Sequence, residues 1–134
     1  MDSWLQNLKE KLQLEHQKPF VLPIKVDGSH IDNLNHVNNE VYLTLMLQGA
    51  IAHAGSLGFN LNKYKELGGY FVVRRHEIDY LAPALEGDDV RVATWIGELG
   101  RSSIMRHYHI FNATQNRPSA EGLTKWIFVD INSG

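Results

Sequence analysis

Polar side chains crowd into one short segment of the chain. They are Asp32, Asn33, Asn35, His36, Asn38 and Asn39. The segment supplies a carboxylate and an imidazole, which exchange protons with reacting groups, and carboxamides that hold polar ligands. A loop that only connects two elements needs about one cap, so this density suggests a site. The alternative is an asparagine-rich loop whose side chains satisfy backbone groups and cap a helix, and composition alone does not decide between the two.

The elements on either side would position this segment. Residues Phe20 to Val26 predict a first strand, and Pro23 indicates that this strand lies at an edge or is irregular. The polar stretch from Asp27 to Asn38 predicts a loop. From Asn39 to about Gly55 the sequence is apolar on nearly all sides and contains no proline, which predicts a helix buried on most faces.

The second half of the chain has the pattern of long strands, rich in β-branched and aromatic residues. We expect strands over Tyr70 to Leu81, Val90 to Leu99, Ser103 to Thr114, and Leu123 to Ile131. Turn signals separate them at Pro83 to Asp89, Gly100 to Ser102, and Asn116 to Gly122, the last with Pro118. One strand, a helix and four strands in hairpin order predict an α+β domain, with a mostly antiparallel sheet around a single helix.

The start of the chain predicts a further helix. Ser3 is a suitable N-cap, and apolar residues recur after it at helical spacing, namely Trp4, Leu5, Leu8 and Leu12. We expect an amphipathic helix over residues 1–18, followed by a single domain over residues 19–134, since a chain of 134 residues has the usual size of one domain.

The bulk composition narrows the class of protein. A content of 43% hydrophobic and 21% charged residues fits a globular domain with a sizeable core. The formal net charge of -2 gives no electrostatic footprint for nucleic acid. Without cysteine there is no disulfide, thiolate nucleophile or cysteine metal site, which fits a reducing cytoplasm. No run approaches the ~18 apolar residues of a membrane span. We therefore expect a cytoplasmic protein with no nucleic-acid partner and no membrane span.

The segment HIDNLNHVNNEVYL resembles the signature of the hot-dog-fold thioesterases related to 4-hydroxybenzoyl-CoA thioesterase and the long-chain acyl-CoA thioesterases, where an aspartate precedes HVNN and a buried helix. The resemblance continues in order through EIDYLAPALEGDDV, LGRSSI and AEGLTKWIFVDI, and so covers Lys25 to Ile131. It implies a hot-dog fold, an antiparallel sheet of about five strands wrapped around one long helix. The N-terminal helix would be an addition to that fold.

The resemblance also implies roles for three catalytic positions. Asp32 matches the carboxylate that attacks the thioester or activates water, and an ordinary aspartate is an anion at neutral pH. Asn39 matches the position at the helix start whose backbone N–H polarises the thioester carbonyl. His36 belongs to the same motif and would position Asp32 or water, or bind a neighbouring loop.

Substrate contacts are expected at two places. The first is the matched motif, in which Asn38 and Tyr42 are candidate substrate contacts. Asn38 is equally suited to cap the helix. Arg101, Ser102 and Ser103 match a turn near the pantetheine or phosphate end of coenzyme A, and arginine binds phosphates through its planar fork.

The chain departs from the family pattern at two positions. Asn35 stands where glycine often precedes the histidine, so it must adopt the turn conformation that glycine allows. In the helix, where many relatives carry a carboxylate, Gln48 is the one polar side chain of LMLQGAI, and an amide is no base. His107 and His109 share a strand face, but no third ligand is evident, so no metal site is predicted.

These expectations converge on hydrolysis of an acyl-CoA or acyl carrier protein thioester, with no metal or redox cofactor required. A non-catalytic acyl-binding or assembly module with the same fold is the alternative, and the missing helical carboxylate keeps it open. A hot-dog dehydratase fits less well, because its histidine lies in a different sequence context. We also expect a homodimer or dimer of dimers, in which Asp32 of one chain faces Arg74 to Asp79 of the other.

Overall fold

The structure, a computed structural model, describes residues 18–131. The helix predicted over residues 1–18 lies, except for its last residue, outside this range. The described elements are β1 (Phe20–Lys25), a short 3-10 helix η1 (Gly28–His30), α2 (Asn39–Ser56), α3 (Leu61–Leu67), β2 (Gly69–Tyr80), β3 (Asp89–Leu99), β4 (Ser103–Asn112) and β5 (Arg117–Asp130).

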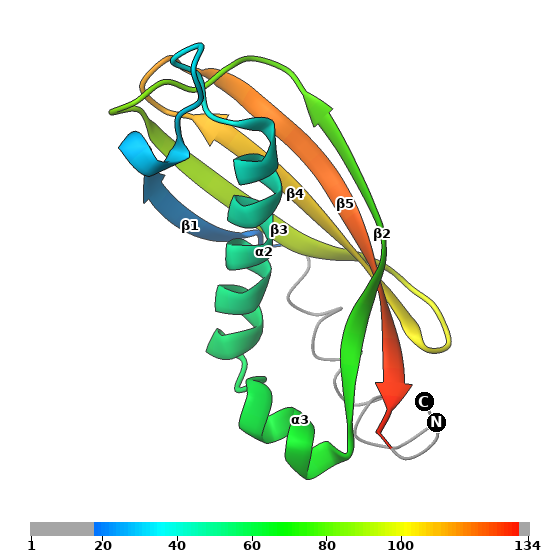
Figure 1. Ribbon diagram of the computed structural model, residues 1–134. Coiled ribbons are helices and arrows are strands. Elements are labelled where there is room, and N and C mark those ends of the chain that lie inside the picture. The colour runs from blue at the N-terminus through cyan, green and yellow to red at the C-terminus, as the bar shows by residue number, and fades with distance from the viewer. Residues whose placement is uncertain (1–17, 132–134) are drawn as a thin grey trace.

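The strands form one antiparallel sheet in the order β1-β3-β4-β5-β2, and α2 lies across one face of it (Figure 1). This arrangement confirms the predicted hot-dog fold. Pro23 lies in β1 at the edge of the sheet, as predicted, where a missing N–H is tolerated. Among the described residues, no helix has the length and apolar character needed to cross a membrane.

The start of β5 differs from the prediction. The turn spans residues 113–116, with Asn116 at a φ of 55°, and the strand already begins at Arg117. Pro118 is tolerated because β2 pairs with β5 only as far as Ala120, so Pro118 has a neighbour on the β4 side alone. Gly122 serves close packing and not a turn, since a Cβ there would lie 2.5 Å from the Glu77 carbonyl oxygen.

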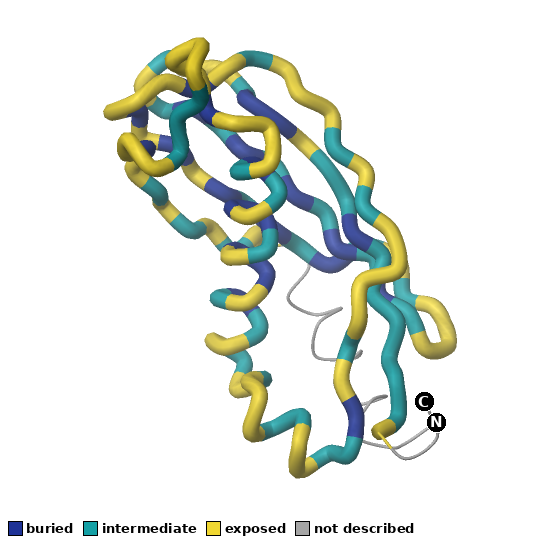
Figure 2. The backbone as a smooth tube through the Cα atoms, in the orientation of Figure 1, coloured by how far each residue is buried: buried dark blue, intermediate teal, exposed yellow. Residues whose placement is uncertain are grey.

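Helix α2 buries one stripe and not most of its surface. The buried residues follow helical spacing: Tyr42, Leu45, Met46, Gly49, Ala50 and His53. A Cβ at Gly49 would lie 3.0 Å from Val92 Cγ1, so glycine lets the helix approach β3 closely. On the other side Ile51 is 70% exposed, and buried and exposed positions alternate along the helix (Figure 2). The expected burial on most faces is therefore wrong for the single chain.

The loop between β2 and β3 is fixed to the core by a buried carboxylate. Asp88 is 6% exposed and accepts hydrogen bonds from Leu85 N (2.9 Å), Asn112 Nδ2 (2.8 Å) and Gln115 Nε2 (2.8 Å). Burial alone would raise the pKa of Asp88, but these hydrogen bonds outweigh it and lower the pKa. The folded loop therefore holds Asp88 as an anion.

Replacing Asp88 with asparagine should lower the free energy of unfolding at pH 7 by about 1 to 3 kcal/mol, because hydrogen bonds to a charged acceptor are lost. Since the folded pKa lies below the unfolded value of about 3.9, this contribution is complete above that value and disappears as the pH falls through the folded pKa. Urea unfolding of both proteins between pH 3 and 7 measures this, and the difference between their free energies of unfolding should shrink as the pH falls.

The neighbouring Asp89→Asn is the matched control. Its carboxylate is 64% exposed and pairs with Lys25 at 3.6 Å, so its loss should change the free energy of unfolding by less than about 1 kcal/mol. Equal effects of the two substitutions would contradict a special role of Asp88.

Candidate active site

The Asp32 carboxylate is held in place by its own loop. Oδ1 accepts hydrogen bonds from the backbone amides of Leu34 (2.9 Å) and His36 (3.2 Å). The Asp32 backbone N–H donates to the carbonyl of His36 at 2.8 Å, which closes a tight turn beside the Ile31–Val37 bridge. Oδ2 accepts no hydrogen bond from any residue between 18 and 131. One oxygen therefore fixes the loop while the other remains available for a ligand.

Asn35 adopts the conformation that its position was expected to require. Its φ is 66°, in the left-handed region, and its N–H donates to the carbonyl of Asp32 at 3.1 Å. Asparagine reaches this region more readily than most other non-glycine residues. The departure from glycine therefore leaves the turn intact.

The start of α2 has one backbone N–H without an acceptor among the described residues. Asn38 caps the helix, with Oδ1 accepting from Glu40 N (3.1 Å) and its carbonyl accepting from Val41 N (2.9 Å). Within the described part of the chain, no hydrogen bond uses the N–H of Asn39, the first residue of the helix. An unpaired amide at a helix start, at the positive end of the helix dipole, is suited to an anion or a polarised carbonyl oxygen.

Asp32 and the helix start share a cavity of about 400 Å³. The lining comes from the loop, the start of α2, the end of β2 and the start of β5, and comprises Asp32, Leu34, His36, Val37, Asn38, Asn39, Tyr42, Tyr80, Leu81, Ala82, Pro83 and Ser119. All of the predicted catalytic residues, together with Asn38 and Tyr42, thus lie at one place.

Two tyrosines build one wall of this cavity. Tyr42 is buried, and its hydroxyl accepts the N–H of Ala84 at 3.0 Å. Burial raises the pKa of Tyr42, and the charges of Asp32 and Asp88 raise it further, so the phenol stays neutral. The ring of Tyr80 packs edge-on against Tyr42, and its hydroxyl donates to the Asn39 carbonyl at 3.3 Å. Tyr42 therefore links the helix to the loop after β2.

His36 contributes to the site mainly through its backbone. Its N–H and carbonyl both bond Asp32, whereas its imidazole is exposed and forms no hydrogen bond with the described residues. Any residue with a backbone N–H can supply these bonds, so the geometry gives the imidazole no positioning role toward Asp32.

Ser119 was not anticipated from the sequence. Ile110 pairs with Ala120 and Phe111 pairs with Pro118, so Ser119 is the extra residue of a β-bulge. It is 1% exposed, lines the cavity, and its hydroxyl has no hydrogen-bond partner among the residues described. The shift in register is what turns this side chain inward, and no local sequence signal marks it apart from Pro118.

The predicted contacts at Arg101, Ser102 and Ser103 lie far from Asp32 within one chain. Ser103 pairs with Ile127, eight residues along β5 from Ser119, or roughly 25 Å. Figure 1 shows the β3–β4 turn and the Asp32 loop at opposite ends of the sheet. Gln48 is also exposed and does not line the Asp32 cavity. No group of three potential metal ligands occurs within residues 18–131.

Comparison with known proteins gives the family that the chain matches. Residues 26–134 match the thioesterase-like superfamily. A chloroplastic acyl-acyl carrier protein thioesterase of Arabidopsis thaliana is 28% identical over 108 residues, which are 79% of this chain and 57% of that protein. The chain therefore spans little more than half the length of this relative.

Solved structures show the same fold. A thioesterase of Thermus thermophilus, complexed with coenzyme A and Zn, is 31% identical, with a TM-score of 0.70 over 82% of this chain and 78% of its own. A 1,4-dihydroxy-2-naphthoyl-CoA thioesterase from Synechocystis is 19% identical, with a TM-score of 0.78 over 84% of this chain and 83% of its own.

The two tyrosines provide a test of how the cavity wall is built. Tyr42→Phe should lower the free energy of unfolding by about 1 to 3 kcal/mol, because it leaves the buried N–H of Ala84 without an acceptor. Tyr80→Phe removes a longer bond from a residue that is 50% exposed, so we expect a much smaller change. Chemical denaturation measures both, and a larger loss for Tyr80→Phe would refute this assignment.

Proposed function

The chain belongs to the thioesterase-like superfamily, and from this premise we propose that it hydrolyses acyl thioesters of coenzyme A or of acyl carrier protein. One observation carries the proposal. Asp32, which has one carboxylate oxygen without a hydrogen bond to the described residues, and Asn39, whose N–H has no acceptor among them, line the same cavity.

In the proposed reaction the thioester carbonyl oxygen accepts the N–H of Asn39. That hydrogen bond strengthens as the oxygen becomes negative, and removal of one such donor in other enzymes costs roughly 2.7 to 4 kcal/mol at the barrier. The helix dipole acts in the same direction. The carbonyl carbon is thereby made more open to attack.

Asp32 supplies the attack by one of two routes. As a general base, it takes a proton from water while the water oxygen bonds to the carbonyl carbon. As a nucleophile, it bonds to that carbon itself, and water then hydrolyses the resulting anhydride. In both routes the C–S bond breaks and the sulfur leaves as a thiolate, which needs less help from an acid than an alkoxide does.

A non-catalytic acyl-binding module is the competing function. The observation in its favour is that α2 brings no carboxylate to the cavity, so Asp32 is the one acid in its lining. A thiol-release assay over a panel of medium-chain, long-chain and aromatic acyl-CoA thioesters, with a chelator present, separates the two. Tight binding without release of coenzyme A would favour the module.

Asp32→Asn should lower turnover at least about a hundredfold, or roughly 2.7 kcal/mol at the barrier. The amide keeps an oxygen that can accept the Leu34 and His36 N–H groups, so the loop should stay folded while the anion is lost. The thiol-release assay gives the rates, and circular dichroism checks the fold.

His36→Ala serves as the comparison for this variant. It keeps the backbone bonds to Asp32, so turnover should fall much less. A folded Asp32→Asn protein with nearly normal turnover would mean that another group carries the reaction.

We further propose that two chains pair through β2. This strand lies at the sheet edge, and several large side chains on or beside it are exposed, namely Tyr70 (42%), Val72 (37%), Val73 (39%), Tyr80 (50%) and Leu81 (49%). A long edge strand with exposed apolar side chains readily pairs with another chain. Antiparallel pairing about a twofold axis would bring opposite ends of two chains together, and so Arg101, Ser102 and Ser103 of one toward Asp32 of the other.

Val73→Lys should therefore shift the protein toward monomer and lower its activity, because a lysine on an edge strand opposes pairing. Val21→Lys is the matched control, since Val21 is 49% exposed on the opposite edge strand, β1. Light scattering and the thiol-release assay on the same samples report both effects. A fully active monomer would overturn the shared site.

A further inference from the structure

Arg106 is a buried cation without an anionic partner in the described chain. It lies in β4, in the middle of the sheet between Ile96 and Thr124, and is 6% exposed. No aspartate or glutamate within residues 18–131 forms an ion pair with it. Burial lowers the pKa of Arg106, because it disfavours the charged form of the side chain. Charged groups are rarely buried in this way unless they are paired.

The hydrogen bonds of Arg106 leave one side of its guanidinium unused. Nη1 donates to His53 Nδ1 (2.9 Å) and to Thr94 Oγ1 (3.1 Å). Because a guanidinium only donates, Nδ1 of His53 must be the unprotonated ring nitrogen. Nε and Nη2 form no hydrogen bond with the described residues. Those two nitrogens form a fork that matches the two oxygens of a carboxylate.

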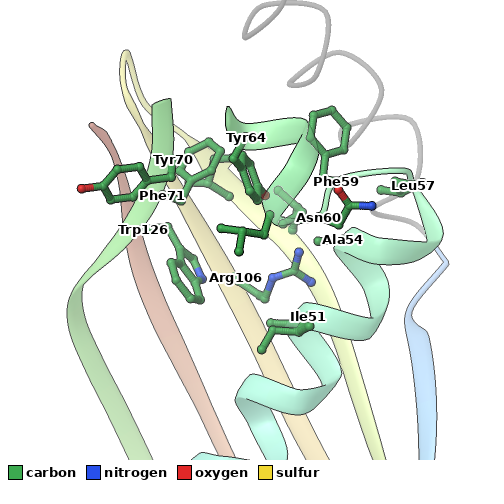
Figure 3. Close-up of a pocket in the computed structure, with 14 residues that line it drawn as sticks. Ile51, Ala54, Leu57, Phe59, Asn60, Tyr64, Tyr70, Phe71, Arg106 and Trp126 are labelled. Carbon is green, nitrogen blue, oxygen red and sulfur yellow. The ribbon is translucent and has the colours of Figure 1, made fainter. Parts of the chain in front are cut away.

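The guanidinium lies in a second cavity, of about 410 Å³ (Figure 3). Its lining is mostly apolar and aromatic: Ala50, Ile51, Ala54, Leu57, Phe59, Asn60, Leu61, Tyr64, Tyr70, Phe71, Ile96, Ile104, Arg106 and Trp126. The volume is in the range of small-molecule sites, which combine apolar walls with a few polar anchors. Arg106 is the one charged group in this lining.

We propose that this cavity binds a carboxylate carried on an apolar body, with the carboxylate on Arg106 and the body against the aromatic walls. A single guanidinium balances a single negative charge. A phosphate would bring up to two charges and no apolar surface for Phe59, Phe71 and Trp126 to cover. The proposal concerns binding, and it holds whether or not the chain hydrolyses thioesters.

Such a carboxylate has two possible sources. It is either a free acid, as thioester hydrolysis releases, or the far end of an acyl group that carries a second carboxylate. The second source rests on the proposed function. Both sources require that the cavity binds a carboxylate, and this binding is tested first, with free acids.

Isothermal titration calorimetry of the full chain with octanoate and with 1-octanol tests that chemistry. Octanoate should bind more tightly than the alcohol, and Arg106→Met should weaken octanoate binding at least about 30-fold with little effect on the alcohol. Arg91→Met, an exposed arginine outside this cavity, is the control and should bind octanoate normally.

Ala54→Phe provides a second test that leaves Arg106 intact. Its ring would take up part of the cavity, so both octanoate and octanol should lose affinity. Equal binding of octanoate and octanol to the native chain, or unchanged octanoate binding by a folded Arg106→Met protein, would overturn the proposal.

Comparison of kcat/KM for octanoyl-CoA and 7-carboxyheptanoyl-CoA then separates the two sources. A preference for the carboxylated thioester that Arg106→Met abolishes supports recognition of the acyl group. Equal rates, with inhibition by octanoate that requires Arg106, support recognition of the free acid. Absence of turnover with both thioesters would count against the proposed function alone, because octanoate binding is measured separately.

Discussion

The close approach of α2 to the sheet positions the groups at the site. Gly49 lets the helix lie against Val92, and Gly122 leaves room on β5 beside Met46. A side chain at either position would have to displace its neighbours, and the helix start would move with the helix. That start carries the N–H of Asn39, and the loop that holds Asp32 bonds to it through the Asn38 N–H, which donates to the His30 carbonyl at 2.9 Å. Packing at the middle of the helix therefore sets where the helix start, together with the loop bonded to it, lies against the sheet.

Asp32 combines a structural and a chemical role in one side chain. The two amides bound to Oδ1 orient the carboxylate before any ligand binds, and Oδ2 keeps its capacity to accept a hydrogen bond. Asn38 likewise has two roles. It accepts hydrogen bonds from two amides of the first turn, and this leaves the Asn39 N–H as the donor without a partner in the described chain. Local hydrogen bonds thus determine which groups a ligand meets, and the tyrosine wall keeps that arrangement attached to the core.

Local patterns in the sequence predicted what local forces determine. The start of α2 at Asn39, the edge position of Pro23 and the left-handed Asn35 each follow from the residue and its neighbours. The bulge at Ser119 depends on the register with β4, and Pro118 is the one nearby residue that hints at it. Arg106 could have been found, because it lies on the same buried face of β4 as Ile104, Tyr108 and Ile110, at the two-residue spacing of a strand. The exposed side of α2 was misjudged because an apolar helix surface has the same sequence whether it is covered or exposed.

The two cavities lie at opposite ends of α2, with Asn39 at one and Ile51 at the other, about 18 Å apart along the helix axis. The buried residues Tyr42, Leu45 and Met46 lie between them along the helix. Antiparallel pairing of two β2 strands would instead bring the two kinds of cavity together across the two chains. It would set the Tyr70 end of one strand beside the Tyr80 end of its partner, and these two tyrosines line different cavities. A thioester at Asp32 would then have the partner's Arg106 cavity beside it, and an acyl group could extend from one chain into the other.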